Sequence, residues 1–194
     1  LGKWGEHGNG DGQLNGPAGI AFDSQDNAYV ADQHNNRVQK FTPDGRYVLQ
    51  WGEGGTGDGQ FNLPWGVAVD SEDNVYVADW RNDRVQKFSS DGRFLAVLGE
   101  PGDGAGQLKR PSDVAVDAEG YLYVADWGNE RVQVFAPDGS FVLTEHGRAT
   151  LSKWAEEFFA SNPDERVTRD QSNLTPDLPE HLRATPYLIS SQTE

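Results

Sequence analysis

Cysteine and methionine are both absent from this chain of 194 residues. Without cysteine, the protein can form no disulfide framework, no thiolate metal site and no cysteine nucleophile. Without methionine the chain also lacks an initiator residue, so we interpret it as a processed chain or as a piece of a longer protein.

Basic side chains are scarce. The chain has 16 lysines and arginines against 31 aspartates and glutamates, which gives a formal net charge of −15 at pH 7. This balance argues against nucleic acid as a partner, because affinity for a phosphate backbone comes from neutralising phosphates with Lys and Arg. The sequence also has no uninterrupted apolar run of about 18 residues, so we expect no segment that crosses a membrane.

An internal repeat is the strongest pattern that is present. Residues 17–23 read Pro-Ala-Gly-Ile-Ala-Phe-Asp, and closely similar segments return at residues 64–70 and 111–117, in two steps of 47 residues. The segments Tyr-Val-Ala-Asp and Arg-Val-Gln recur with the same spacing. Three copies of this length with strand-like content indicate the blades of a β-propeller.

Each repeat contains four short strand candidates. In the second repeat they are residues 66–70, 75–79, 84–88 and 94–98. The segments between them are rich in Asp, Asn, Ser and Gly, which suit tight turns between antiparallel strands. The sequence therefore predicts one four-stranded blade per repeat, with repeats of about residues 6–52, 53–99 and 100–146.

The repeated motifs resemble those of the NHL-repeat family. The resemblance rests on Pro-x-Gly-Val-Ala-Val-Asp, Tyr-Val-Ala-Asp and Asn-x-Arg-Val-Gln-Lys-Phe, and it covers about residues 1–146. It implies a six-bladed propeller, of which three blades are present, so we expect missing blades or self-association to complete the ring. The family's namesake histidine before the arginine is replaced here by Asn36, Asp83 and Glu130.

A different pattern begins after residue 146. Leu151, Trp154, Ala155, Phe158 and Phe159 recur at the spacing of one face of an amphipathic helix. Prolines amid polar residues follow. We therefore predict an all-β fold, a partial six-bladed NHL-type β-propeller of three blades, followed at residues 147–194 by a helix and an irregular, proline-rich linker.

The loops between the second and third strands and the loops between blades share one face in propellers generally. Loops on a rigid scaffold often carry function, and Trp and Arg are enriched at binding hot spots. The candidate ligand-binding residues on this face are His34, Trp65, Trp80, Arg81, Lys109, Arg110 and Trp127. The alternative is that each tryptophan only packs over its own hairpin.

An aspartate stands five residues before an arginine in every repeat. The pairs are Asp32 with Arg37, Asp79 with Arg84, and Asp126 with Arg131. Each pair flanks one hairpin and can meet across it. An ion pair repeated in every blade is a structural device, and we do not interpret it as catalytic.

We identify no catalytic residues, no metal ligands and no cofactor. The glycine-rich loops lack the Lys-Ser/Thr pair of a phosphate loop and the carboxylate ladder of a calcium loop, so we interpret them as connectors. The sequence favours a non-catalytic scaffold that binds a protein, a peptide or a small ligand. The alternative is a metal-dependent lyase or hydrolase in the propeller channel, similar to peptidyl-α-hydroxyglycine lyase.

Overall fold

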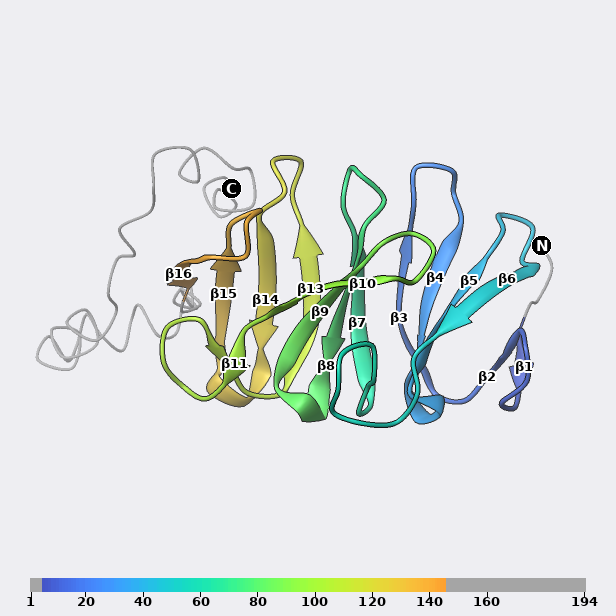
Figure 1. Ribbon diagram of the computed structural model, residues 1–194, viewed down its shortest axis with the longest axis horizontal. Coiled ribbons are helices and arrows are strands. Elements are labelled where there is room, and N and C mark those ends of the chain that lie inside the picture. The colour runs from blue at the N-terminus through green and yellow to red at the C-terminus, as the bar shows by residue number, and fades with distance from the viewer. Residues whose placement is uncertain (1–4, 146–194) are drawn as a thin grey trace, which may run out of the picture. The chain divides into compact units, whose positions relative to one another are not determined.

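A computed structural model describes residues 5–145 of the chain (Figure 1). The helix and linker expected at residues 147–194 lie outside the described residues. No helix within residues 5–145 has the length and apolar character needed to span a membrane.

The described residues form three four-stranded sheets in which each strand pairs with its neighbours in the chain. The first comprises β3 (Pro17–Phe22), β4 (Ala28–Asp32), β5 (Arg37–Phe41) and β6 (Tyr47–Trp51). The second comprises β7 (Pro64–Val69), β8 (Val75–Asp79), β9 (Arg84–Phe88) and β10 (Phe94–Leu98). The third comprises β13 (Pro111–Val116), β14 (Leu122–Asp126), β15 (Arg131–Phe135) and β16 (Phe141–Glu145). The predicted all-β fold of three four-stranded blades is confirmed. In the second blade, only the first strand differs from its expected limits: it spans Pro64–Val69 instead of residues 66–70.

A short 3₁₀ helix joins the second and third strands of every blade. These helices are η1 (Gln33–Asn35), η2 (Trp80–Asn82) and η3 (Trp127–Asn129). Each ends at a residue in the left-handed conformation, with φ of 52°, 54° and 54° at Asn36, Asp83 and Glu130. Asn and Asp adopt this conformation more readily than most residues.

The residues at these positions also connect neighbouring blades. The side-chain Oδ1 of Asn36 accepts a hydrogen bond from the Leu63 backbone N–H at 2.8 Å. Asp83 Oδ1 accepts one from the Arg110 backbone N–H at 2.7 Å. Asn36 and Asp83 therefore each hold the start of the next blade.

The glycine-rich connections between blades fold back on themselves, which the sequence did not predict. β1 (Glu6–His7) pairs in parallel with β2 (Gln13–Leu14), and β11 (Glu100–Pro101) pairs in parallel with β12 (Gln107–Leu108). The middle connection keeps one parallel bridge, between Gly54 and Phe61.

The core lies between the blades. One cluster joins blades one and two and the connection between them; it contains Tyr29, Ala31, Val38, Phe61, Val67, Val75, Val77 and Phe88. A second cluster joins blades two and three; its members are Ala68, Tyr76, Ala78, Val85, Leu98, Leu108, Val114, Leu122, Val124 and Phe135. All five residues of β8 are buried, because a neighbouring blade covers each face of this strand. Such strands lack a polar face, which is why their sequences are almost continuously apolar.

The first blade has an uncovered side. Ile20 on β3 is 51% exposed, whereas the equivalent Val67 and Val114 are 6% and 7% exposed. Phe22, on the same strand, is 58% exposed. No described blade covers these two side chains.

Candidate ligand-binding face

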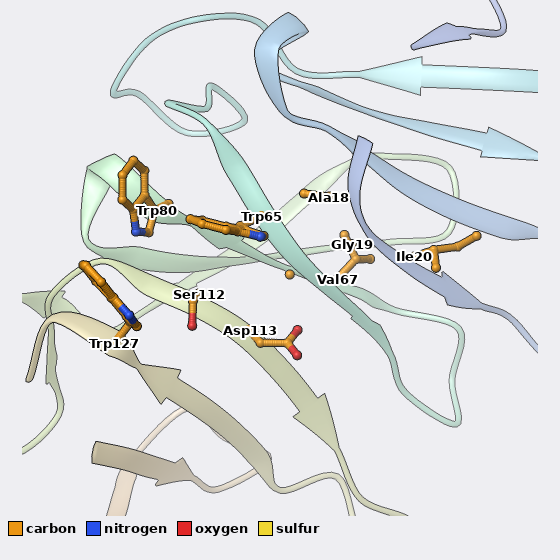
Figure 2. A pocket seen from close by; sticks show the side chains of 10 residues that line it. Ala18, Gly19, Ile20, Trp65, Val67, Trp80, Ser112, Asp113 and Trp127 are labelled. Carbon is orange, nitrogen blue, oxygen red and sulfur yellow. The ribbon is translucent and has the colours of Figure 1, made fainter. Parts of the chain in front are cut away.

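An open pocket of about 630 Å³ lies at the inner strands of the three blades (Figure 2). Its lining consists of Ala18, Gly19, Ile20, Trp65, Gly66, Val67, Trp80, Ser112, Asp113 and Trp127. These residues come from β3, β7 and β13 and from the 3₁₀ helices η2 and η3. Three of the seven ligand-binding candidates, Trp65, Trp80 and Trp127, line this pocket.

Trp80 is the best-packed of the three tryptophans. Its ring lies edge-on to Trp65, with centroids 5.4 Å apart and an interplanar angle of 79°. The guanidinium carbons of Arg81 and Arg110 each lie 5.4 Å from the centroid of Trp80, which is within the range of a cation–π interaction. The buried Nε1 of Trp80 has no hydrogen-bond partner among the described residues.

Trp65 and Trp127 leave much more of their surface in water. Trp65 is 40% exposed and Trp127 is 60% exposed. In Figure 2 the three indoles gather at one end of the pocket, with Ala18, Gly19 and Ile20 at the other. The pocket therefore has an aromatic end whose rings are partly open to solvent.

His34 and Lys109 do not line the pocket. The imidazole of His34 packs against Gly16, where an added Cβ would lie 2.7 Å from Nδ1. Lys109 uses its backbone: its N–H donates to Asp126 Oδ1 at 2.7 Å and its carbonyl accepts from the Gly128 N–H at 2.8 Å. The structure thus brings five of the seven predicted residues together, three in the lining and two stacked on Trp80.

Asp113 lines the pocket and was not predicted from the sequence. It stands where the first two blades have Gly19 and Gly66. Those glycines are needed because the inner strands approach closely: a Cβ on Gly19 would lie 2.5 Å from the Trp65 carbonyl oxygen, and one on Gly66 would lie 2.5 Å from the Asp113 Cα. The departure from glycine in the third repeat is the signal that could have identified Asp113.

The aspartate–arginine pairs form in all three blades. The Arg Nε lies 2.7 Å from the Asp Oδ2 in the first and third blades and 2.9 Å in the second, and all three carboxylates are buried. In the second blade, Arg84 Nη2 also donates to the carbonyls of Gly57 and Gln60 at 2.7 and 2.9 Å. Each pair therefore fastens the glycine-rich connection to its own blade.

A buried glutamine completes this network. Gln86 Nε2 donates to the Gln60 carbonyl at 2.8 Å and to Asp79 Oδ2 at 3.1 Å, while its Oε1 accepts from the Gly59 N–H at 2.9 Å. Asp79 Oδ1 accepts from the Asn62 N–H at 2.7 Å. Equivalent glutamines are buried in the other blades. Because these groups are paired with one another, we interpret the network as structural.

A second polar cluster differs between blades. Asp23 lies 3.0 Å from Lys40 Nζ, and Asp70 lies 3.4 Å from Lys87 Nζ. Burial acts to raise the pKa of Asp23, but hydrogen bonds from Asn27, Lys40 and the Gln25 backbone outweigh it and lower this pKa to about 2.

The third blade has Val134 at the position of the lysine. There, Tyr123 donates its hydroxyl hydrogen to Asp117 at 3.1 Å. Burial, followed by the Asp117 charge, raises the pKa of Tyr123 to about 12. The Asp117 carboxylate is therefore held by the neutral Tyr123 hydroxyl and by the backbone N–H groups of Glu119 and Tyr121.

The described residues contain no group of three or more His, Cys, Asp and Glu side chains arranged to hold a metal ion. His7 and His34 lie in β1 and η1. His146 and His181 lie outside the described residues.

Comparison with known proteins agrees with this architecture. The NHL repeat model matches residues 14–41, 61–88 and 108–135, one match in each blade. Protein lin-41 of Caenorhabditis elegans is 47% identical over 45 residues, which is 23% of this chain and 4% of that protein. Protein brain tumor of Drosophila melanogaster is 42% identical over 48 residues, or 25% of this chain and 5% of that protein. The matched segments thus span a small fraction of these relatives.

Among solved structures, virginiamycin B lyase from Staphylococcus aureus superposes with a TM-score of 0.52. It is 14% identical and the match covers 69% of this chain and 42% of the lyase chain. At this identity the likeness shows the fold alone.

The three blades, each with the same buried network of Asp, Arg and Gln, define a β-propeller module built from sequence repeats. The chain carries three NHL repeats, one in each blade.

Proposed function

We propose that this chain is a non-catalytic binding scaffold that holds a small ligand, or a side chain of a protein or peptide, in the pocket at its inner strands. The observation that carries the proposal is the group of three tryptophans, two of them substantially exposed, around an open pocket. The volume of about 630 Å³ lies within the range of about 300–1,000 Å³ that is usual for ligand pockets.

The repeat itself supports a binding role for these residues. Trp80 and Trp127 are matched by Gln33 in the first blade, and Trp65 is matched by Ala18 and Ser112. Asp79 and its equivalents, which form the buried network of each blade, are instead the same in every copy. The variation at the pocket is expected of positions that select a ligand.

No specific observation favours the enzymatic alternative. Within residues 5–145 no cluster offers three metal ligands, and the likeness to virginiamycin B lyase concerns the fold. The binding scaffold therefore remains the function that the geometry supports best.

The uncovered side of β3 supports a further part of the proposal, that another blade packs there. The blade comes either from a longer parent chain or from a second copy of this one. Exposed apolar surface of this kind favours association. We expect sedimentation of the isolated chain to show self-association or aggregation at micromolar concentration. A variant with both Ile20→Ser and Phe22→Ser should associate less. If the unsubstituted chain stays monomeric, this part of the proposal is contradicted.

The binding role is tested by a ligand screen followed by nuclear magnetic resonance of the indole N–H groups. A ligand of the pocket should shift the signals of Trp65 and Trp127. Trp51 is the internal control, because its ring packs between Tyr29 and Phe88 at the interface of blades one and two. Trp127→Ala should then weaken binding by about 2 kcal/mol or more, the usual effect of a hot-spot residue. Ligands that shift other signals and bind this variant normally would contradict the proposal.

A further inference from the structure

We infer that the ligand of this pocket carries a methylated ammonium group, the chemistry shared by choline-like small molecules and methylated lysine side chains. This inference rests on the proposed function, because it names the ligand class of the same pocket. Three features carry it: exposed indoles, a single carboxylate, and few side-chain acceptors.

The indoles are the first feature. Trp has the aromatic side chain that attracts cations most strongly, through the negative face of its ring. Trp80 already interacts with the guanidiniums of Arg81 and Arg110, neither of which belongs to the pocket lining. Trp65 and Trp127 have the exposed surface that remains for a ligand. A cation of the ligand would meet these two rings.

The carboxylate is the second feature. Asp113 is the one ionisable side chain in the pocket lining. It is exposed, Oδ1 accepts a hydrogen bond from its neighbour Val114 N–H at 3.0 Å, and it forms no ion pair within residues 5–145. Its charge is thus available to a ligand. The net charge of −15 also favours the approach of cations over anions.

The scarcity of acceptors is the third feature and separates a methylated ammonium from a primary one. A primary ammonium brings three N–H donors that each need an acceptor. Among the side chains of the lining, only Ser112 and Asp113 carry acceptor oxygens, and Asp113 Oδ1 already accepts from the Val114 N–H. A quaternary ammonium has no N–H donor, and its methyl groups fit an apolar, aromatic wall. The lining therefore suits the methylated cation better.

The experiment compares choline with 3,3-dimethylbutan-1-ol, a neutral molecule of nearly the same shape in which carbon replaces the nitrogen. Both are titrated into the full chain at low salt, and the indole signals of Trp65 and Trp127 are followed. We expect choline to shift these signals and to bind at least about threefold more tightly than the alcohol, the lower range for an exposed cation–π contact. Equal affinities would overturn the inference while leaving the pocket as a binding site.

Asp113→Asn tests the role of the carboxylate. The substitution removes the charge at an exposed position and keeps the shape, so the thermal melt should stay near that of the parent. We expect weaker binding of choline and unchanged binding of the alcohol. The same loss for both compounds, or for neither, would overturn the inference. Asp113→Gly, which restores the residue found in the first two blades, should behave in the same way.

A peptide containing trimethyl-lysine distinguishes the two sources of the cation. Tighter binding of this peptide than of choline and of the unmodified peptide supports a protein partner. Equal or weaker binding than choline supports a small molecule. If neither choline nor the trimethylated peptide shifts Trp65 or Trp127 while another ligand of the screen does, the inference fails and the proposed function stands.

Discussion

Asp79 and Trp80 are neighbours in the sequence, but Asp79 belongs to the buried network of its blade and Trp80 to the pocket. Asp79 is fully buried in the network with Arg84 and Gln86, and the same three residue types occur in every blade. Trp80 lines the pocket, and its counterparts are Gln33 and Trp127. The same residue types in every blade thus form the buried network, whereas we propose that the differing residues at the pocket recognise a ligand.

The largest effect should come from the fastening network. Asp79→Ala leaves the buried Arg84 guanidinium without its carboxylate, so we expect the free energy of unfolding to fall by about 3–5 kcal/mol. Asp126→Ala should cause a similar loss, because the third blade has the same pair. Urea unfolding measures both. A loss below about 1 kcal/mol in either variant would mean that the pair does not fasten its blade.

A smaller effect is expected where the inner strands approach each other. Gly66→Ala places a Cβ 2.5 Å from the Asp113 Cα, so the two strands must separate. We expect a loss of about 1–3 kcal/mol, the usual cost of overpacking. The matched control is Asp113→Ala at the equivalent position of the third blade, where a side chain is already accommodated. If the two variants lose the same free energy of unfolding, the close approach of the strands is not what requires glycine at residue 66.

The polar cluster of the first blade should respond to acid. The pKa of Asp23 is about 2, below its ordinary value of 3.8, so the ionised carboxylate stabilises the folded state. This contribution is fully present above about pH 4 and is lost as the pH falls towards 2. Between pH 5 and pH 2, the free energy of unfolding should therefore decline less steeply for Asp23→Asn than for the unsubstituted chain. Lys40→Met should move the carboxyl titration of Asp23 to higher pH; an unmoved titration would show that the lysine does not matter.

The fold could be predicted because its information is local and occurs three times. Alternating turn residues and apolar runs located β8, β9 and β10 at their observed limits. The parallel pairs in the connections were missed because a strand of two residues has no periodicity. The structural role of Gln86 was also missed, since its partner Gln60 reaches it only after the connection folds back.

The pocket was only partly predictable. General propeller geometry placed Trp65, Trp80 and Trp127 on one face, and the structure brings them into one lining. The position of Asp113 depends on how closely two inner strands pack, and that distance cannot be obtained from one repeat. The stacking of Arg110 on Trp80 joins residues of different blades, which the sequence does not pair.

Urea unfolding of Trp127→Ala beside Asp126→Ala, two substitutions at adjacent residues of one loop, separates a ligand-binding position from a structural one. We expect the free energy of unfolding to fall by less than about 1 kcal/mol for the tryptophan, which is 60% exposed, and by about 3–5 kcal/mol for the buried aspartate. If Trp127→Ala instead lost about 3–5 kcal/mol, as truncation of a buried tryptophan does, the tryptophan would be a packing residue. That result would contradict the claim that the varied positions recognise a ligand while the repeated ones hold the fold.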